Sequence, residues 1–233
     1  ISLTNAGNKF AAVGTLSTSG GGISLLDSTG DLSLTGALSA TGEVKIRTGG
    51  LLSQSAPITT SFAGDAIVLA ANAYTNTAGA AALNPTTTGA RWLVYASAPT
   101  ITYGGLVSGS AAVFNTTISV QPSSIPAGNR FVFAHQPIVT ITANPITRTY
   151  DGPAAFAVPT FALTGLVDAA LFGNAFTQDV SSGSLAVTSP SKNVGIYGVG
   201  LGTLTVPSGY QINYTGANAS VTPAALTITA PTV

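Results

Sequence analysis

The sequence predicts an all-β protein in which a β-solenoid-like N-terminal part precedes an antiparallel β module of sandwich or grasp-like form. Short apolar runs interleaved with Thr, Ser, Asn and Gly are typical of strands, and no stretch has convincing helical periodicity. The segment PIVTITA at Pro137–Ala143 is nearly repeated as PAALTITA at Pro223–Ala230, which places Ile141 and Ile228 87 residues apart. A repeat of that size indicates tandem β modules rather than one enzyme domain.

Composition restricts the classes of protein to which the chain can belong. Its 233 residues suffice for one large or two ordinary domains. Seven basic and seven acidic residues leave no basic footprint for nucleic acid, and no apolar run reaches the 18 residues of a membrane-spanning segment. The absence of Cys excludes disulfides and Cys-ligated zinc. Because the chain opens at Ile1 without Met and the second repeat copy runs to Val233, we expect a longer parent polypeptide.

Residues 1–136 are predicted to form the solenoid with its capping or bridging strands. The expected strands are short and separated by Gly: Ile23–Leu26, Leu32–Leu34, Val44–Ile46 and Ile67–Leu69. Their spacing suits a coil with two or three short strands per turn and roughly 20 residues per turn. Such turns stack about 4.8 Å apart, and Gly is expected at the corners, where a positive φ is needed.

The rest of this part is less regular. Residues 72–90 are small and polar, so we expect a loop there. The run RWLVY at Arg91–Tyr95 is the strongest single strand and contains the only Trp. Between Ser97 and Pro137, further short strands are expected to cap the solenoid or to bridge to the next module.

Residues 137–224 are predicted to form the second module, and residues 225–233 to begin a further one with the strand Leu226–Ala230. Its expected strands are Val139–Ala143, Ala154–Val158, Phe161–Leu163, Leu185–Thr188, Val199–Val206 and Ile212–Tyr214. Leu166–Phe172 is expected to form a helical turn or a short helix.

Four motifs in this region resemble the YDG/MBG type of module found in tandem in bacterial surface proteins. They are ITANPITRTYDG at Ile141–Gly152, LTGL at Leu163–Leu166, KNVG at Lys192–Gly195 and YQINYTG at Tyr210–Gly216. The family pattern continues with Gly-Asp after its Leu-x-Gly-Leu element. This chain departs from that pattern, because Val167-Asp168-Ala169 follows instead.

The first part resembles the late solenoid of filamentous-haemagglutinin-type exoproteins. The resemblance lies in NKFAAVG at Asn8–Gly14 and TTGARWLVYASAP at Thr87–Pro99. It implies a large adhesin that is exported by two-partner secretion, through a partner pore in the outer membrane, to the bacterial cell surface. A host or matrix glycan or protein, or a second copy, is then the expected partner.

Several residues are candidates for functional sites. Tyr150-Asp151-Gly152 is a candidate ligand site, but we favour a turn in which Asp bonds its own backbone, Gly supplies positive φ and Tyr packs on the core. The only His, His135, shows no nucleophile or orienting partner, so we interpret it as a linker or packing residue.

Acidic and basic side chains leave two further hypotheses. A calcium ladder is one interpretation of Asp27, Asp31, Glu43 and Asp65, but their isolation favours solvated corner residues. Lys192 is a candidate for an isopeptide bond if it is buried, although a surface Lys in a turn is the favoured interpretation. The candidate partners of that bond are Asn193, Asn213 and Asn218, with Asp151 or Asp179 as proton shuttle.

Trp92, Tyr95 and Tyr103 are the candidate ligand contacts, since aromatic rings stack on sugars. The simpler interpretation is packing, because Trp92 and Tyr95 have opposite parity on a strand and cannot share a face. No catalytic residue, metal site or cofactor site is predicted. We therefore expect a non-catalytic structural segment of a secreted adhesin or biofilm-matrix fibre. The alternatives are a carbohydrate-binding module that uses exposed aromatics and a self-assembling extracellular filament subunit.

Overall fold

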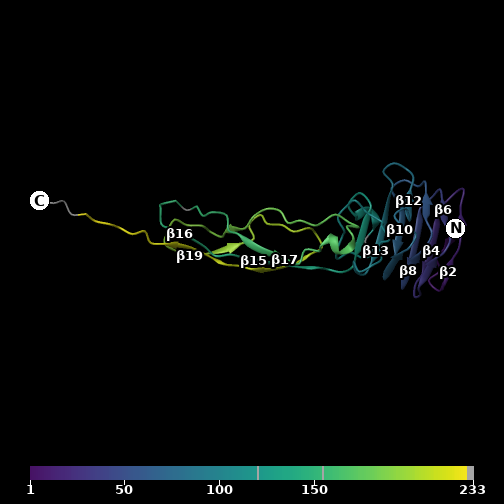
Figure 1. Ribbon diagram of the computed structural model, residues 1–233, viewed down its shortest axis with the longest axis horizontal. Helices are drawn as coiled ribbons and strands as arrows, with labels where there is room; N and C mark the ends of the chain where they lie inside the picture. Colours follow the sequence, from purple (N-terminus) through teal and green to yellow (C-terminus); the bar gives the residue numbers. More distant parts are fainter. Residues whose placement is uncertain (120, 154, 230–233) are drawn as a thin grey trace. The chain divides into compact units, whose positions relative to one another are not determined.

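The computed structural model describes residues 1–119, 121–153 and 155–229, and the chain separates into two compact units (Figure 1). The first unit comprises Ile1–Pro137 and Val167–Asp179. The second comprises Ile138–Leu166 and the chain from Val180 onward. The two predicted parts are continuous in sequence, whereas Val167–Asp179, which lies within the expected second module, groups with the first unit.

The first unit is a parallel β-solenoid with three faces, as predicted. Its main face is a six-stranded sheet of β1 (Ser2–Leu3), β4 (Ile23–Asp27), β7 (Val44–Thr48), β10 (Asp65–Ala70), β13 (Arg91–Ala96) and β14 (Arg130–Phe133). The second face contains β2 (Ala12–Val13), β5 (Leu32–Leu34), β8 (Leu51–Gln54) and β11 (Ala73–Asn76). The third contains β3 (Leu16–Ser17), β6 (Leu38–Ala40), β9 (Ile58–Thr60) and β12 (Leu83–Pro85). Figure 1 shows these strands stacked side by side.

The solenoid core consists of ladders in which each coil repeats the buried position of the one before. Ile23 lies beside Val44, and Val44 beside Ile67, in parallel register. All three side chains are buried. Along β4 and β7, every second residue is buried in this way, and the residues that alternate with them point outward. This register reaches a segment that the sequence left as loop. The polar residues 72–90 contain β11 and β12 because β8 and β9 of the preceding coil supply their hydrogen-bonding partners.

Glycines occur at the corners of the coils for two different reasons, of which only the positive φ was expected. Gly64 has a φ of 73°, as a tight corner requires. Gly42 has no positive φ, and its requirement comes from the neighbouring coil: a Cβ there would lie 2.5 Å from the Gly22 nitrogen. Close stacking of successive coils therefore selects Gly42.

Polar side chains inside the solenoid find partners there. The Tyr74 hydroxyl donates to Gln54 Oε1 at 2.6 Å, and Gln54 Nε2 donates to the Ala82 carbonyl at 2.9 Å. Asn76 Nδ2 donates to the Tyr103 carbonyl at 2.8 Å. Since each burial is compensated by a hydrogen bond, these residues bind successive coils together.

The second unit contains two small mixed sheets. The first is three-stranded, in the order β17 (Phe161–Thr164), β15 (Ile138–Ala143) and β20 (Gln211–Thr215). The second is four-stranded, in the order β16 (Ile146–Thr149), β21 (Asn218–Thr222), β19 (Gly195–Gly200) and β18 (Ala186–Val187). β17, β18 and β19 pair antiparallel with their neighbours, but β15 pairs parallel with β20, and β16 with β21.

Some expected elements of this unit differ from those observed. Ala154 lies outside the described residues, and residues 155–158 form no strand. The strand expected at Val199–Val206 begins and ends earlier, as β19. Residues 225–229 of the expected further module form no strand and are exposed, while residues 230–233 lie outside the described part. Among the described residues, no helix has the length and hydropathy needed to cross a membrane.

Candidate functional site

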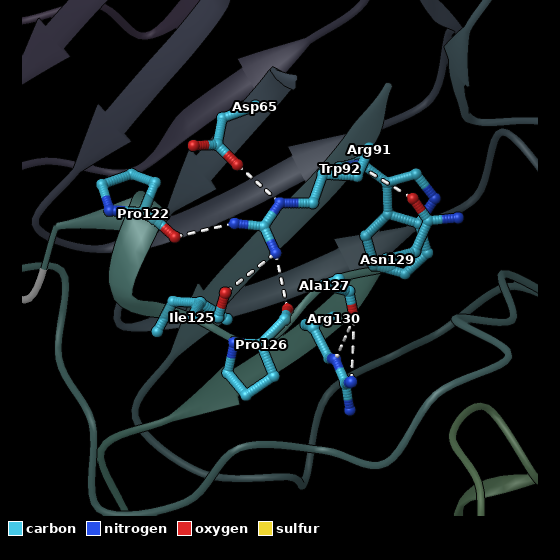
Figure 2. A network of polar contacts seen from close by, with 9 residues as sticks. All are labelled: Asp65, Arg91, Trp92, Pro122, Ile125, Pro126, Ala127, Asn129 and Arg130. Carbon is cyan, nitrogen blue, oxygen red and sulfur yellow. Dashed lines mark hydrogen bonds and ion pairs between the residues drawn. The ribbon is translucent and has the colours of Figure 1, made fainter. Parts of the chain in front are cut away.

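A polar clamp holds a loop segment over the outer face of the main sheet (Figure 2). Arg91, the first residue of β13, donates from Nε to Asp65 Oδ1 at 2.5 Å. Its remaining N–H groups donate to the carbonyls of Pro122 at 2.7 Å, Ile125 at 3.1 Å and Pro126 at 2.5 Å. Guanidinium is planar and carries several donors, so one side chain can bind a whole turn of backbone.

Beneath this clamp lies an apolar cluster. It consists of Val68, Ala70, Leu93, Tyr95, Ile125 and Val132, with Val113 and Ile118 packed against it. Both faces of β10 and β13 are consequently buried, which explains why Arg91–Tyr95 is apolar at every position after the Arg. Burial, and secondarily the charge of Asp65, raises the pKa of Tyr95 to about 12, so its hydroxyl is neutral at physiological pH.

Aromatic rings close the interior of the last coil. Phe131 on β14 lies next to Trp92 and Tyr103, with ring centroids 5.0 Å and 4.9 Å from its own, and Phe133 on the same strand lies 6.4 Å from Phe131. Phe176 joins them, 6.3 Å from Phe133. Large rings thus cover the aliphatic core beside β14, the last strand in the order of the main sheet.

Phe176 comes from Val167–Asp179, the segment inserted from the second module's sequence. Its short 3₁₀ helix, Ala169–Phe172, is capped by the Asp168 side chain, which accepts from the Ala170 amide at 2.9 Å. The segment is bonded to the solenoid loops through Ser108 N to the Ala175 carbonyl at 2.8 Å. The predicted helical turn is present, but its packing partner was missed. The signal available in the sequence was the departure, at Val167, from the pattern of the YDG/MBG-type modules that the flanking motifs resemble.

The three candidate sugar-contacting rings are buried. Trp92, Tyr95 and Tyr103 are 2%, 3% and 8% exposed. Their burial agrees with packing, the interpretation favoured from the sequence, and argues against the alternative that these rings are exposed for sugar contact. Trp92 packs inside the coil on Phe131, and Tyr95 lies in the outer cluster, on opposite faces of β13 as their parity requires.

The four acids considered for calcium each have a protein partner. Asp27 is buried and accepts three backbone N–H groups, so it is not a solvated corner residue. Asp31 accepts from the Leu51 amide at 2.7 Å, Glu43 pairs with Lys45 at 3.1 Å, and Asp65 pairs with Arg91. They form no ladder.

The remaining candidates are exposed. Gly152 has a φ of 100°, as a turn requires, but Asp151 accepts from Arg148 Nη1 at 2.5 Å, and the ring of Tyr150 is not packed on the core. Lys192 is exposed, which removes the buried environment that an isopeptide bond needs. The candidate partners Asn193, Asn213 and Asn218 are exposed as well, and Asp179 belongs to the first unit. His135 is exposed at the end of β14, and its backbone carbonyl accepts from the Asn115 amide at 2.9 Å.

In the described part of the chain, grooves that could hold a small ligand occur in each unit. One, of about 250 Å³, lies on the solenoid beside Arg47, Asn72 and Thr117. The other, of about 380 Å³, lies in the second unit between residues 155–159 and residues 184–190 and is mainly apolar.

No cluster of three or more potential metal ligands occurs in the described part of the chain. The all-β solenoid fold is compatible with a structural role. Comparisons with protein-family models, curated proteins and solved structures found no match to this chain.

Proposed function

We propose that this chain is a non-catalytic, load-bearing segment of a large secreted bacterial surface adhesin or matrix fibre. The proposal is supported by the stacked β-coils, by the repeated Ile-Thr-Ala segments and by the resemblance to filamentous-haemagglutinin-type and YDG/MBG-type sequences. In this role the protein gives a surface fibre stiffness and reach. Export through a partner outer-membrane pore and display at the cell surface belong to the same proposal.

The course of the chain through the second unit carries the proposal. β15 and β16 follow one another along one run, and β20 and β21 along a second run beside it. The pairing begins with Ile138 opposite Gln211 and ends with Thr149 opposite Thr222, in parallel throughout. The chain therefore enters at one end of the unit and leaves β21 at the other. At 3.3 Å per residue, the run spans about 35 Å, so tandem copies would add length.

This arrangement also determines how the unit bears tension. Force applied at Ile138 and Thr222 acts along two parallel neighbouring runs from opposite ends. The hydrogen bonds between the runs are then sheared together. If both attachment points lay at the same end, the bonds would open one after another at lower force. Forced unfolding is governed by the unfolding barrier, and shear raises that barrier.

Engineered cysteines test this directly, because the chain has no natural Cys. The double variant Ile138→Cys with Thr222→Cys is held in shear, and Ile138→Cys with Gln211→Cys is held so that the same runs unzip. All three positions are exposed, so the substitutions leave the core intact. In single-molecule pulling under reducing conditions, we expect a markedly higher unfolding force for the shear pair at equal loading rate. Equal forces for the two pairs would contradict a load-bearing role.

A further inference from the structure

The groove beside Arg47 lies on the outer face of the main sheet, where β7 and β10 end. Arg47, Ala70 and Tyr95 occupy successive register positions on β7, β10 and β13. Because Ala70 is small and its two neighbours are large, the sheet is hollowed between them. Thr116 and Thr117 form part of the opposite wall, and the groove has a volume of about 250 Å³.

The groove carries a positive charge that no described residue neutralises. Arg47 is exposed and makes no hydrogen bond or ion pair with any residue in the described part of the chain. No acidic residue lines the groove. Lys45, two residues earlier on the same face of β7, is instead paired with Glu43 at 3.1 Å and does not line the groove.

Neutral polar groups complete the lining. At one end Ser97 Oγ donates to Asn72 Oδ1 at 2.5 Å, which orients the Asn72 amide and leaves its N–H donors available. Thr116 and Thr117 line the wall; the Thr116 hydroxyl donates to the Phe114 carbonyl at 3.1 Å, and the Thr117 hydroxyl is hydrogen-bonded to the Ser119 hydroxyl. The floor includes Ala70, whose side chain lies on the same outer face as those of Arg47 and Tyr95. Since the strands beneath are already paired on both sides, no free strand edge is available to bind a peptide backbone.

We propose that this groove binds one carboxylated sugar residue, a hexuronic acid, within an acidic polysaccharide. The carboxylate pairs with the Arg47 guanidinium, whose fork matches its two oxygens. Ring hydroxyls bond to the free N–H groups of the Asn72 amide and to the remaining hydrogen-bonding capacity of the Thr117 hydroxyl, and the apolar ring face lies on Ala70. A volume near the lower limit of small-molecule sites fits a single sugar ring.

The test is titration of the whole chain with trigalacturonic acid, followed by amide chemical shifts in nuclear magnetic resonance. We expect shifts confined to the surroundings of Arg47, Asn72, Ser97 and Thr116–Thr117. The methyl ester of the same trimer keeps the sugar rings and loses the charge of the carboxylates, so its affinity should be lower by a factor of about ten or more. Absence of saturable shifts with the acid would overturn the inference.

Matched variants identify the site. Arg47→Gln should weaken binding about tenfold or more, whereas Lys45→Gln, on the same strand and face, should leave it unchanged. Ala70→Leu fills the floor and keeps the charge, and it should abolish binding while the thermal transition is retained. Equal losses in Arg47→Gln and Lys45→Gln, or no loss in Arg47→Gln, would contradict the proposal. A hexaglutamate peptide that produced the same shifts at equal affinity would overturn the sugar assignment.

Discussion

At the scale of single residues, Asp27 has the most demanding environment of the solenoid's acids. Its carboxylate accepts from the backbone amides of Phe10 at 2.7 Å, Gly30 at 3.0 Å and Thr29 at 3.2 Å. These bonds, that of Phe10 first, lower the pKa of Asp27 below its ordinary value. One side chain thereby fixes both the corner after β4 and the segment of the preceding coil.

The lowered pKa makes the stability of the first unit depend on pH. A carboxyl group whose pKa is lower in the folded state stabilises the fold above its unfolded pKa, which is about 3.9. That stabilisation should be lost as the pH falls below about 4 and through the folded pKa. Asp27→Asn should lower the midpoint of urea unfolding at pH 7 and flatten the acid dependence of stability below about pH 4. An unchanged pH profile in Asp27→Asn would contradict this role.

The sequence shows what kind of residue stands at a position more readily than what surrounds it. The opposite faces of Trp92 and Tyr95 follow from strand parity and were predicted. Packing was the favoured interpretation, but the segments that cover these two rings were not predicted, because they come from distant parts of the chain. Ile125 covers the Tyr95 side, while Phe131 packs on Trp92. Arg47 gave no signal by itself, since its groove depends on the register that places Ala70 beside it.

At the scale of elements, alternation predicted the strands that have strong apolar residues and missed those that lack them. β4, β7 and β10 were expected from their Ile, Leu and Val residues. β11 and β12 contain AYTN and LNP and become strands only because the preceding coil offers hydrogen-bonding partners. The helical turn at Ala169–Phe172 was expected, but periodicity carries no information on the unit against which it packs.

The inserted segment Val167–Asp179 should stabilise the first unit through its buried residue Phe176 and not through its exposed residue Leu171. Phe176 is buried among Phe133 and Tyr103, whereas Leu171 is 77% exposed. Phe176→Ala should lower the free energy of unfolding by about 3–5 kcal/mol, and Leu171→Ala should change it by less than about 0.5 kcal/mol.

Fluorescence of Trp92 during urea unfolding is the appropriate measurement for both variants. Trp92 is the only Trp of the chain and lies in the first unit, so its signal reports on that unit. Equal effects of the two substitutions would show that the segment is not part of this core.

At the scale of the whole molecule, two isoleucines at the same position of the sequence repeat differ in burial. Ile141 and Ile228 hold the same place in the two Ile-Thr-Ala segments, yet Ile141 is 1% exposed and Ile228 is 84% exposed. Ile141 lies on β15 between β17 and β20, whereas residues 225–229 form no strand.

The same substitution at both positions tests whether residues 225–229 contribute to the second unit. Ile141→Ala should lower the free energy of unfolding of the second unit by about 2–5 kcal/mol, because it empties a buried site. Ile228→Ala should change it by less than about 0.5 kcal/mol. Native-state hydrogen exchange of the β15 and β20 amides measures this free energy for the unit by itself. A comparable loss in Ile228→Ala would mean that the segment is an internal strand of the second unit.

By itself, the sequence determined the all-β class, the stacked coils of the first part and the start of a different β module after residue 136. These properties are encoded locally, in alternation and turn residues that neighbouring positions share. Only the tertiary structure decided that Val167–Asp179 packs into the first unit, that β15 and β20 run parallel, and that a groove opens beside Arg47. Each of these depends on which distant segments become neighbours, and that choice is made by the summed burial and hydrogen bonding of the whole chain rather than by any one stretch of it.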